Sequence, residues 1–86
     1  MNREKILQEA EKVINGDRAK DYGDARENHQ RIADMWSAIL GHPVTVEQVY
    51  QCMIAVKLAR LSNSPDHQDS WVDIAGYAAL GGESVT

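Results

Sequence analysis

The chain has 86 residues, of which 43% are hydrophobic and 26% are charged, and its formal net charge is −4. A domain this small buries only about 60–65% of its unfolded surface, so a lone monomer has modest stability and association of copies is a common remedy. The acidic balance and the lack of a basic stripe argue against nucleic-acid binding. A small phosphorylated ligand is compatible with this composition, because it needs only a local cluster of cations.

The sequence contains a single cysteine, Cys52, so no internal disulfide can form, and no cysteine spacing typical of a metal site occurs. This usage fits a reducing compartment. No apolar run reaches about 18 residues, and the N-terminus lacks the apolar segment of a signal peptide. The sequence therefore predicts a cytoplasmic protein with no membrane partner.

Apolar residues repeat at helical spacing in four segments, over residues 2–15, 24–40, 45–61 and 66–80. Asp24 and Thr45 are predicted N-caps, and Glu27 and Gln48 follow them by three residues, as in a capping box. Gly41 is expected to end the second helix, and the Gly-Gly pair after residue 80 the fourth. No segment alternates with period two, so we predict an all-α, antiparallel four-helix bundle, completed by oligomerisation.

Two cations interrupt the apolar arc of the third predicted helix. Lys57 projects near the centre of that arc, and Arg60 falls inside it one turn later. Both side chains could bury their stems and keep their charged ends in water, or both could serve a site. The arc itself consists of Val46, Val49, Tyr50, Met53, Ile54, Val56, Leu58 and Leu61.

The second predicted helix also carries polar residues on its inner face, where Asn28 and His29 lie near the N-terminal end. A lone histidine on an apolar face is usually a hydrogen-bonded core residue, and the alternative is a ligand-binding role. The apolar members of this face are Ala25, Ile32, Ala33, Met35, Trp36, Ile39 and Leu40.

The fourth predicted helix is apolar almost all round, yet Asp69 and Asp73 share one stripe with Gly76 and Leu80. A helix of this kind is sequestered, either at the centre of a bundle or beneath a second subunit. Buried carboxylates must be paired or must bind a metal.

Lys57 and Arg60 are the expected partners of Asp69 and Asp73, because the short turn between the helices makes them antiparallel neighbours. One interpretation is a buried ion-pair network that only fixes the register of the two helices. The other is a polar cavity in which the acids bind Mg²⁺ and the cations bind phosphate oxygens. The cost of burying four charges favours the second interpretation.

The connection between the first two helices adds further cations. Arg18, Lys20 and Tyr22 stand just before Gly23 and the second helix. A helix N-terminus with nearby cations suits an anion, and a tyrosine ring can stack on a base. By itself this pattern is weak, because any solvated loop can carry such residues.

The stretches "RAKDYGD", "NHQRIADMWSAILG", "KLAR" and "DSWVDIAGYAAL" resemble a small uncharacterised domain of phages and prophages, over about residues 18–83. This resemblance places the protein in the cytoplasm of a bacterium or a phage-infected host. The positions that carry it are the Arg18/Tyr22/Gly23 loop, Asn28, Lys57 with Arg60, Asp69 with Asp73, Gly76 with Tyr77, and Glu83.

More distantly, the layout is similar to the all-α nucleoside triphosphate pyrophosphohydrolases, the MazG-like group. That resemblance implies a helical bundle in a dimer or tetramer, with Mg²⁺ held by an ExxE…ExxD set of carboxylates. This sequence departs from the pattern: it has Glu27-x-x-Gln30 on the second helix, with Glu27 pointing outward. Asp69 and Asp73 stand four residues apart rather than three, so one Mg²⁺, with help from Asn28 or His29, is the most that we expect.

Three functions remain open from the sequence. The first is a Mg²⁺-dependent pyrophosphohydrolase that converts a nucleoside triphosphate to a monophosphate and pyrophosphate. In it Asp69 and Asp73 hold the metal, and Lys57 belongs to the catalytic set. The predicted ligand-binding residues are Arg18, Tyr22, Asn28, His29, Lys57, Arg60 and Tyr77, with Trp36 as an alternative stacking residue. The second function is a phage protein that binds a nucleotide without turnover, as in sequestering a defence signal. The third is a structural helical module.

Overall fold

The structure is a computed structural model of the whole chain, and it describes residues 1–17 and 24–86. All regular elements in these ranges are helical, which confirms the predicted all-α class. They are α1 (Arg3–Lys12), the short π-helical turn η1 (Val13–Asp17), α3 (Ala25–Leu40), α4 (Val46–Asn63) and α5 (Gln68–Ser84). None of the described helices is both long and apolar enough to cross a membrane.

The helix starts follow the predicted caps. Thr45 with Gln48 forms the complete reciprocal capping box of α4. Asp24 caps α3 by accepting a hydrogen bond from the backbone N–H of Arg26, so the predicted box with Glu27 is not the form that this cap takes. Gly41 ends α3 in the left-handed conformation, with φ of 75°, which a residue with a Cβ atom adopts only at a cost. These local signals therefore fix three of the helix boundaries.

The predicted end of the last helix is wrong. Gly81 and Gly82 do not stop α5, which continues to Ser84. Gly81 packs on the ring of Tyr50: a Cβ atom placed there would lie 3.5 Å from the Tyr50 Cβ. Packing of the last turn against α4 outweighs the weak helix propensity of the two glycines.

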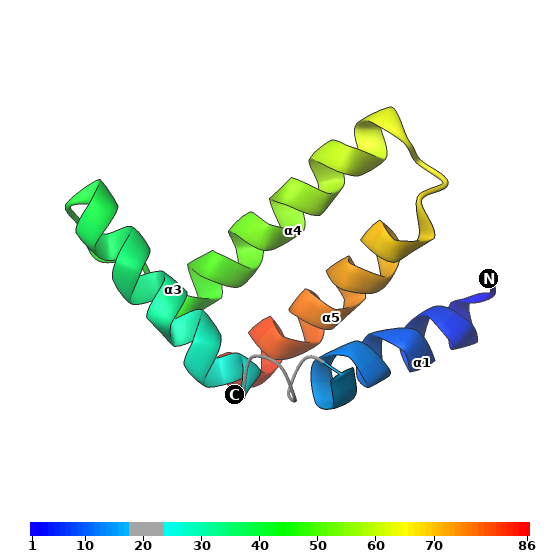
Figure 1. Cartoon of the computed structure of the whole chain (residues 1–86), viewed down its shortest axis with the longest axis horizontal. Coiled ribbons are helices and arrows are strands. Elements are labelled where there is room, and N and C mark those ends of the chain that lie inside the picture. Colours follow the sequence, from blue (N-terminus) through cyan, green and yellow to red (C-terminus); the bar gives the residue numbers. More distant parts are fainter. Residues whose placement is uncertain (18–23) are drawn as a thin grey trace.

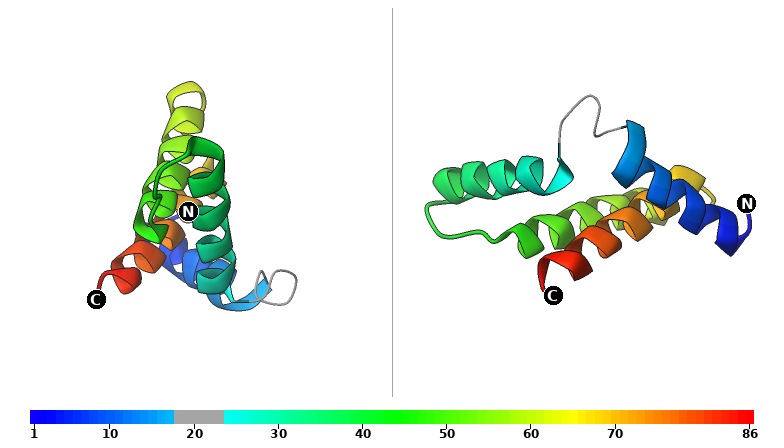
Figure 2. Two further views of the ribbon diagram at one scale, coloured as in Figure 1. Left: turned by 90° about the vertical axis from the view of Figure 1, so that its left-hand side faces the viewer. Right: turned by 90° about the horizontal axis from the view of Figure 1, so that it is seen from below.

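Helices α4 and α5 form an antiparallel pair, and α1 lies along the opposite side of α5 (Figures 1 and 2). Helix α3 crosses the beginning of α4 and then diverges from it, so the bundle is open on that side (Figure 1). The C-terminus of the chain lies near the start of α3, where Arg26 and Glu83 form an ion pair. The predicted antiparallel bundle is thus closed only around α5.

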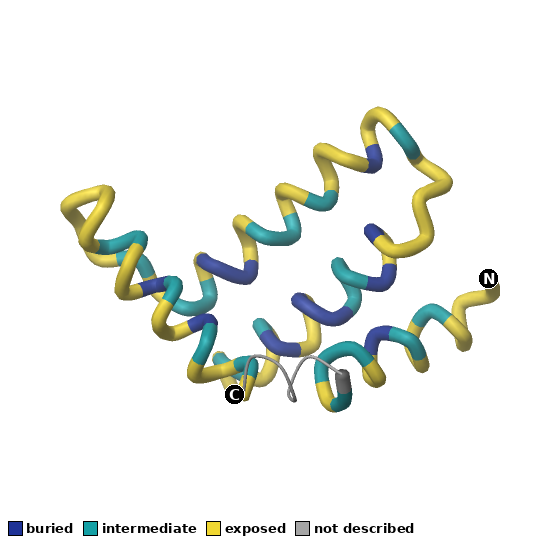
Figure 3. The backbone as a smooth tube through the Cα atoms, viewed as in Figure 1, coloured by how far each residue is buried: buried dark blue, intermediate teal, exposed yellow. Residues whose placement is uncertain are grey.

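The core lies between α4 and α5, with η1 and the start of α3 packed against it, and Figure 3 marks the buried positions along α4 and α5. Tyr50, Tyr77 and Leu80 form its centre. Burying side chains of this size stabilises a fold by about 1.5–3 kcal/mol each. The partly buried residues packed against the centre are Ile14, Ala25, Val46, Met53 and Ile54.

The outer half of α3 departs from the predicted inner face. Met35, Ile39 and Leu40 are 66%, 78% and 59% exposed, although Ala33 on the same helix is completely buried. The reason is geometric: α3 leaves α4 after their crossing, and no other described helix extends that far (Figure 1). The apolar face of α3 therefore extends beyond the part of the helix that the other described helices cover.

Candidate functional site

Lys57 and Asp73 form the predicted contact between α4 and α5. The Lys57 Nζ atom lies 3.0 Å from an Asp73 carboxylate oxygen, and the two side chains are only 11% and 16% exposed. The antiparallel pairing of the helices places them opposite each other, as their positions on the two apolar faces predict. Of the four charges expected in this region, these two meet.

The other two expected members of the network lie elsewhere. Asp69 and Arg60 are both exposed, and neither joins the Lys57–Asp73 pair. Arg60 and Asp69 each lie one helical turn closer to the α4–α5 connection than Lys57 and Asp73. The neighbouring helix covers only part of each apolar arc, and these two positions stay exposed. The prediction that all four charges are buried together is therefore wrong.

The described residues do not fit a built-in Mg²⁺ site at Asp69 and Asp73. Magnesium prefers an octahedral set of oxygen ligands, and here one carboxylate is solvent-exposed while the other is engaged by a lysine. No group of three or more His, Cys, Asp or Glu residues gathers as a possible metal cage within the ranges that the structure covers.

His29 lies in an aromatic cluster rather than on an open surface. Its ring centroid is 4.8 Å from that of Tyr50 and 5.9 Å from that of Tyr77, and its Nδ1 lies 2.6 Å from the carbonyl oxygen of Ala25. His29 and Tyr77 are 9% and 8% exposed, so both serve the core. Asn28, the other predicted polar residue of this face, is half-buried.

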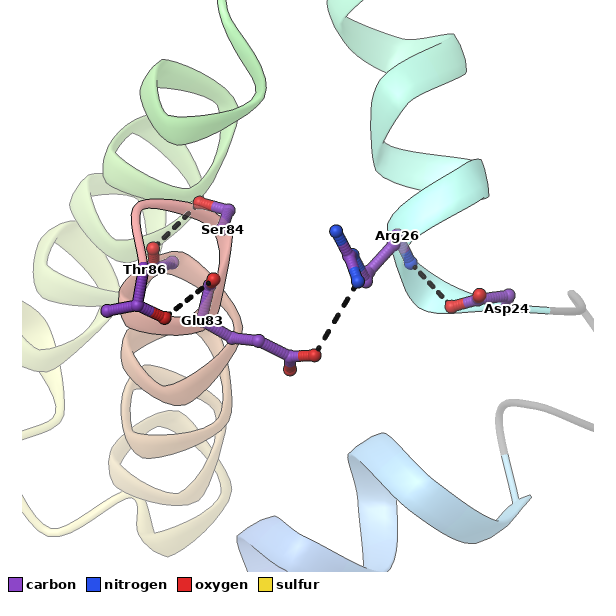
Figure 4. Close-up of polar contacts among 6 residues, drawn as sticks. Asp24, Arg26, Glu83, Ser84 and Thr86 are labelled. Atoms are coloured by element: carbon purple, nitrogen blue, oxygen red, sulfur yellow. Dashed lines mark hydrogen bonds and ion pairs between the residues drawn. The ribbon is translucent and has the colours of Figure 1, made fainter.

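A pocket of about 360 Å³ lies beside this cluster, between the start of α3, the start of α4 and the end of α5. Its volume is at the lower end of the range for small-molecule sites. Figure 4 shows Arg26 reaching from α3 toward Glu83 at the end of α5, with 3.8 Å between the charged groups. The lining residues are Asp24, Arg26, Glu27, Gln30, Val46, Tyr50 and Ser84.

The Tyr50 hydroxyl is the exceptional polar group of this region. It is buried and makes no hydrogen bond to any described residue, although a buried hydroxyl normally has a partner. Burial raises the pKa of this hydroxyl above its ordinary value of 10.0; Arg26 lowers it in part, and Glu83 and Asp24 raise it further. Tyr50 is one of the residues that line the pocket, and its hydroxyl is buried.

Arg60 lines a second, more open pocket of about 520 Å³ at the turn between α4 and α5, together with Ala59, Asn63, Ser64 and His67. This places it at the opposite end of the helix pair from the Tyr50 hydroxyl. Trp36, the predicted alternative stacking residue, is half-buried and lies on α3. The predictions for Arg18 and Tyr22 fall outside the described residues.

A model for a domain of unknown function, DUF6378, matches residues 5–85. The chain belongs to the DUF6378 family. It is 54% identical over 76 residues to the Gene 55 protein of Mycobacterium phage L5, and 43% identical over 75 residues to the Gene 55 protein of Mycobacterium phage D29. The predicted resemblance to a phage domain is thereby confirmed.

Each match covers 87% of this DUF6378 chain, and 49% and 50% of the L5 and D29 proteins respectively. The chain thus spans about half the length of these curated relatives. No solved structure matches the chain.

The pocket contains residues that the sequence patterns did not single out, namely Arg26 and Ser84. They come from the first turn of α3 and the last turn of α5 and share no local motif, so only the packing of these helices brings them together. Tyr50 carried a usable signal: a hydroxyl in the middle of an apolar arc needs a partner. The prediction that Tyr50 lies in the core rested on its aromatic ring alone and did not consider the hydroxyl.

Proposed function

We propose that this chain binds a nucleotide, or a phosphorylated molecule of similar size, in the pocket between α3, α4 and α5. The observation that carries the proposal is the buried Tyr50 hydroxyl without a hydrogen-bond partner among the described residues. Leaving such a group unsatisfied costs about 1–3 kcal/mol, and a bound ligand would remove that cost. The free protein therefore carries this energetic cost, and the complex does not.

The pocket offers the groups that such a ligand needs. Arg26 is 63% exposed, and its contact with Glu83 is long, so its guanidinium can turn to a phosphate or a carboxylate. Gln30 donates to Asp34 through its side-chain nitrogen, which leaves its carbonyl oxygen available to accept a hydrogen bond. Tyr50 and Val46 supply the apolar part of the pocket lining beside these polar groups, and the His29 ring packs against Tyr50 from the core.

The carboxylates that line the pocket indicate which form of the nucleotide it would bind. Asp24 and Glu27 line it, and Glu83 stands next to Ser84. These carboxylates would repel a bare triphosphate more strongly than its complex with Mg²⁺ from solution, because the metal lowers the net negative charge of the nucleotide. The ligand of our proposal is therefore the magnesium complex, and the metal arrives with the nucleotide.

Pyrophosphohydrolysis, which the MazG-like resemblance implies, is a stronger form of the same proposal. It needs carboxylates arranged around a metal and a water molecule. One experiment separates the two forms: the purified chain is incubated with a panel of NTPs and dNTPs plus Mg²⁺, and the products are resolved by anion-exchange chromatography. An intact nucleotide that co-elutes with the protein supports binding, and a monophosphate with pyrophosphate shows catalysis.

The matched variants for this experiment are Arg26→Gln and Arg31→Gln. Arg26 lines the pocket, whereas Arg31 is an exposed arginine of the same helix outside it. Loss of one charge-assisted hydrogen bond is expected to raise the Kd of Arg26→Gln about tenfold, with Arg31→Gln unchanged. Titration calorimetry measures both values. If no nucleotide binds the wild-type chain, or if both variants lose binding equally, the assignment of this pocket is wrong.

Tyr50→Phe should make the free protein more stable and the complex weaker. Removing the unpartnered hydroxyl is expected to raise the free energy of unfolding by about 1 kcal/mol, while the missing ligand contact raises Kd. Urea unfolding with and without nucleotide checks both effects. A Phe variant that is less stable than the wild type would mean that the hydroxyl has a favourable partner in the free protein.

The same variant has a distinct pH profile. Because burial raises the pKa of Tyr50 above 10.0, the folded state holds this proton more tightly than the unfolded chain does. The corresponding stability is complete below pH 10.0 and is lost as the pH rises beyond it. The stability difference between wild type and Tyr50→Phe should therefore grow in favour of the variant above that pH.

A further inference from the structure

The last turn of α5, residues 81–84, is helical although its sequence favours a stop. The turn begins with two glycines, and each disfavours the helical state about four- to fivefold relative to alanine. The same chain uses a glycine to end α3, where Gly41 takes a φ of 75°. Helix α5 instead runs past its glycines to a C-cap at Val85, with φ of −106°. Two ends of α5 therefore compete: one with Gly81 as a left-handed stop, and the observed one a turn later.

The longer end of α5 is held by residues that line the pocket. Gly81 packs on Tyr50, since a Cβ atom placed on the glycine would lie 3.5 Å from the Tyr50 Cβ. Glu83 reaches from α5 to Arg26 on α3, with 3.8 Å between the charged groups (Figure 4). Ser84 lines the pocket, and its hydroxyl donates to the carbonyl oxygen of Gly81 at 2.7 Å. The last turn is thus one wall of the pocket.

The contacts that hold this turn are about as strong as the propensity that opposes it. The side chains of the Arg26–Glu83 pair are 63% and 57% exposed, and an exposed pair of this kind favours the paired state by at most about fivefold. A single glycine opposes the helix by a similar factor. Gly81 brings no side chain to its contact with Tyr50, so that contact buries little apolar surface. Loss of the ion pair is therefore enough to shift the end of α5.

We propose that the Arg26–Glu83 pair sets the end of α5, and that a ligand in the pocket switches it. A phosphate bound to Arg26 takes the place of the Glu83 carboxylate, because two anions at close range repel each other. The unpaired Glu83 then moves away with its turn, and α5 ends at Gly81. This inference rests on the proposed function for the phosphate on Arg26, and it adds that binding opens one wall of the pocket and frees residues 82–86.

The first test needs no ligand. Exchange of the backbone amide hydrogens of Glu83 and Ser84, followed by NMR on the whole chain, measures how often the last turn opens. Arg26→Gln is expected to speed this exchange about two- to fivefold, because it removes the ion pair. The amide of Ile74, in the middle of α5, should not change. Arg31→Gln is the matched control, since Arg31 is an exposed arginine of the same helix outside the pocket.

The second test locks the longer helix with Gly81→Ala. The added Cβ atom would lie at an ordinary contact distance from Tyr50, so alanine fits the helical end. Alanine adopts the left-handed stop only at a cost, which makes the shorter end unfavourable. With Mg²⁺-ATP as the probe, titration calorimetry should give a Kd about tenfold higher for Gly81→Ala than for the wild type. Glu83→Gln, which leaves Arg26 without its competitor, should lower the Kd about two- to fivefold.

Three outcomes would overturn the switch. They are unchanged amide exchange in Arg26→Gln, wild-type affinity for Mg²⁺-ATP in Gly81→Ala, and slower rather than faster exchange at Glu83 and Ser84 when Mg²⁺-ATP binds. If Mg²⁺-ATP does not bind the wild-type chain, the proposed function fails for this nucleotide. The exchange of ligand-free Arg26→Gln then still decides whether the ion pair sets the end of α5.

Discussion

Lys57→Met should lower the free energy of unfolding by about 3 kcal/mol, because it leaves the Asp73 carboxylate desolvated and unpaired. The pair is 3.0 Å apart, and its side chains are only 11% and 16% exposed. A short aspartate cannot reach water by stretching, whereas a lysine can extend its stem. Asp73→Asn is therefore expected to cost less than Lys57→Met.

The double variant Lys57→Met/Asp73→Leu should recover most of this loss, since an apolar pair of similar volume carries no desolvation penalty. Urea unfolding of the wild type, of Lys57→Met, of Asp73→Leu and of the double variant gives the coupling energy directly. The control is Lys5→Met, which breaks the ion pair with Glu9 on α1, where the side chains are 55% and 31% exposed. That change should stay within about 0.5 kcal/mol.

These variants also decide what the ion pair does. If Lys57 and Asp73 only fix the register of α4 and α5, the double variant should still bind the nucleotide that the wild type binds. Loss of binding in a folded double variant would instead show that Lys57 contacts the ligand, as the sequence predicts. A Lys57→Met variant as stable as the wild type would mean that the pair is effectively solvated.

Gly76→Val is expected to lower the free energy of unfolding by about 2 kcal/mol, because it forces η1 away from α5. Gly76 is buried on α5, and a Cβ atom added there would lie 3.0 Å from Cγ2 of Ile14. Such a contact is tighter than most contacts of a Cβ atom, so Ile14 would have to shift, and the larger valine side chain adds to the overpacking, which typically costs about 1–3 kcal/mol in a core.

Gly82→Ala serves as the control in the same helix, since no atom lies within 4 Å of the Cβ position there. That change should be neutral or stabilising by up to about 1 kcal/mol through helix propensity. Thermal unfolding by circular dichroism measures both variants. Adding Ile14→Ala to Gly76→Val should restore part of the loss, and a Gly76→Val protein with wild-type stability would exclude a tight contact between η1 and α5.

Much of the fold follows from local signals. The caps at Asp24 and Thr45, the left-handed Gly41 and the period of the apolar residues predict where the helices begin and end, because each depends on neighbours within one or two turns. The end of α5 was missed for the opposite reason. Gly81 and Gly82 favour termination locally, but the packing of Gly81 on Tyr50 comes from a helix distant in sequence.

The candidate sites divide in the same way. The Lys57–Asp73 pair could be predicted because a short turn joins two helices whose inner faces must meet. The positions of Asp69 and Arg60 could not, since a helical wheel shows how wide an apolar arc is but not how much of it a neighbour covers. Arg26, Tyr50 and Ser84 meet only because three helix ends converge on one pocket.

The sequence by itself determined the all-helical class, the starts of α3 and α4 and the buried Lys57–Asp73 ion pair, because hydrogen bonding and apolar periodicity act over short distances along the chain. Only the tertiary structure decided which apolar faces are covered. The crossing of α3 over α4 buries Ala33 and leaves Met35 and Ile39 exposed to solvent. It also leaves the Tyr50 hydroxyl without a hydrogen-bond partner among the described residues. These outcomes depend on the angle between helices, which the pattern within any single helix does not contain.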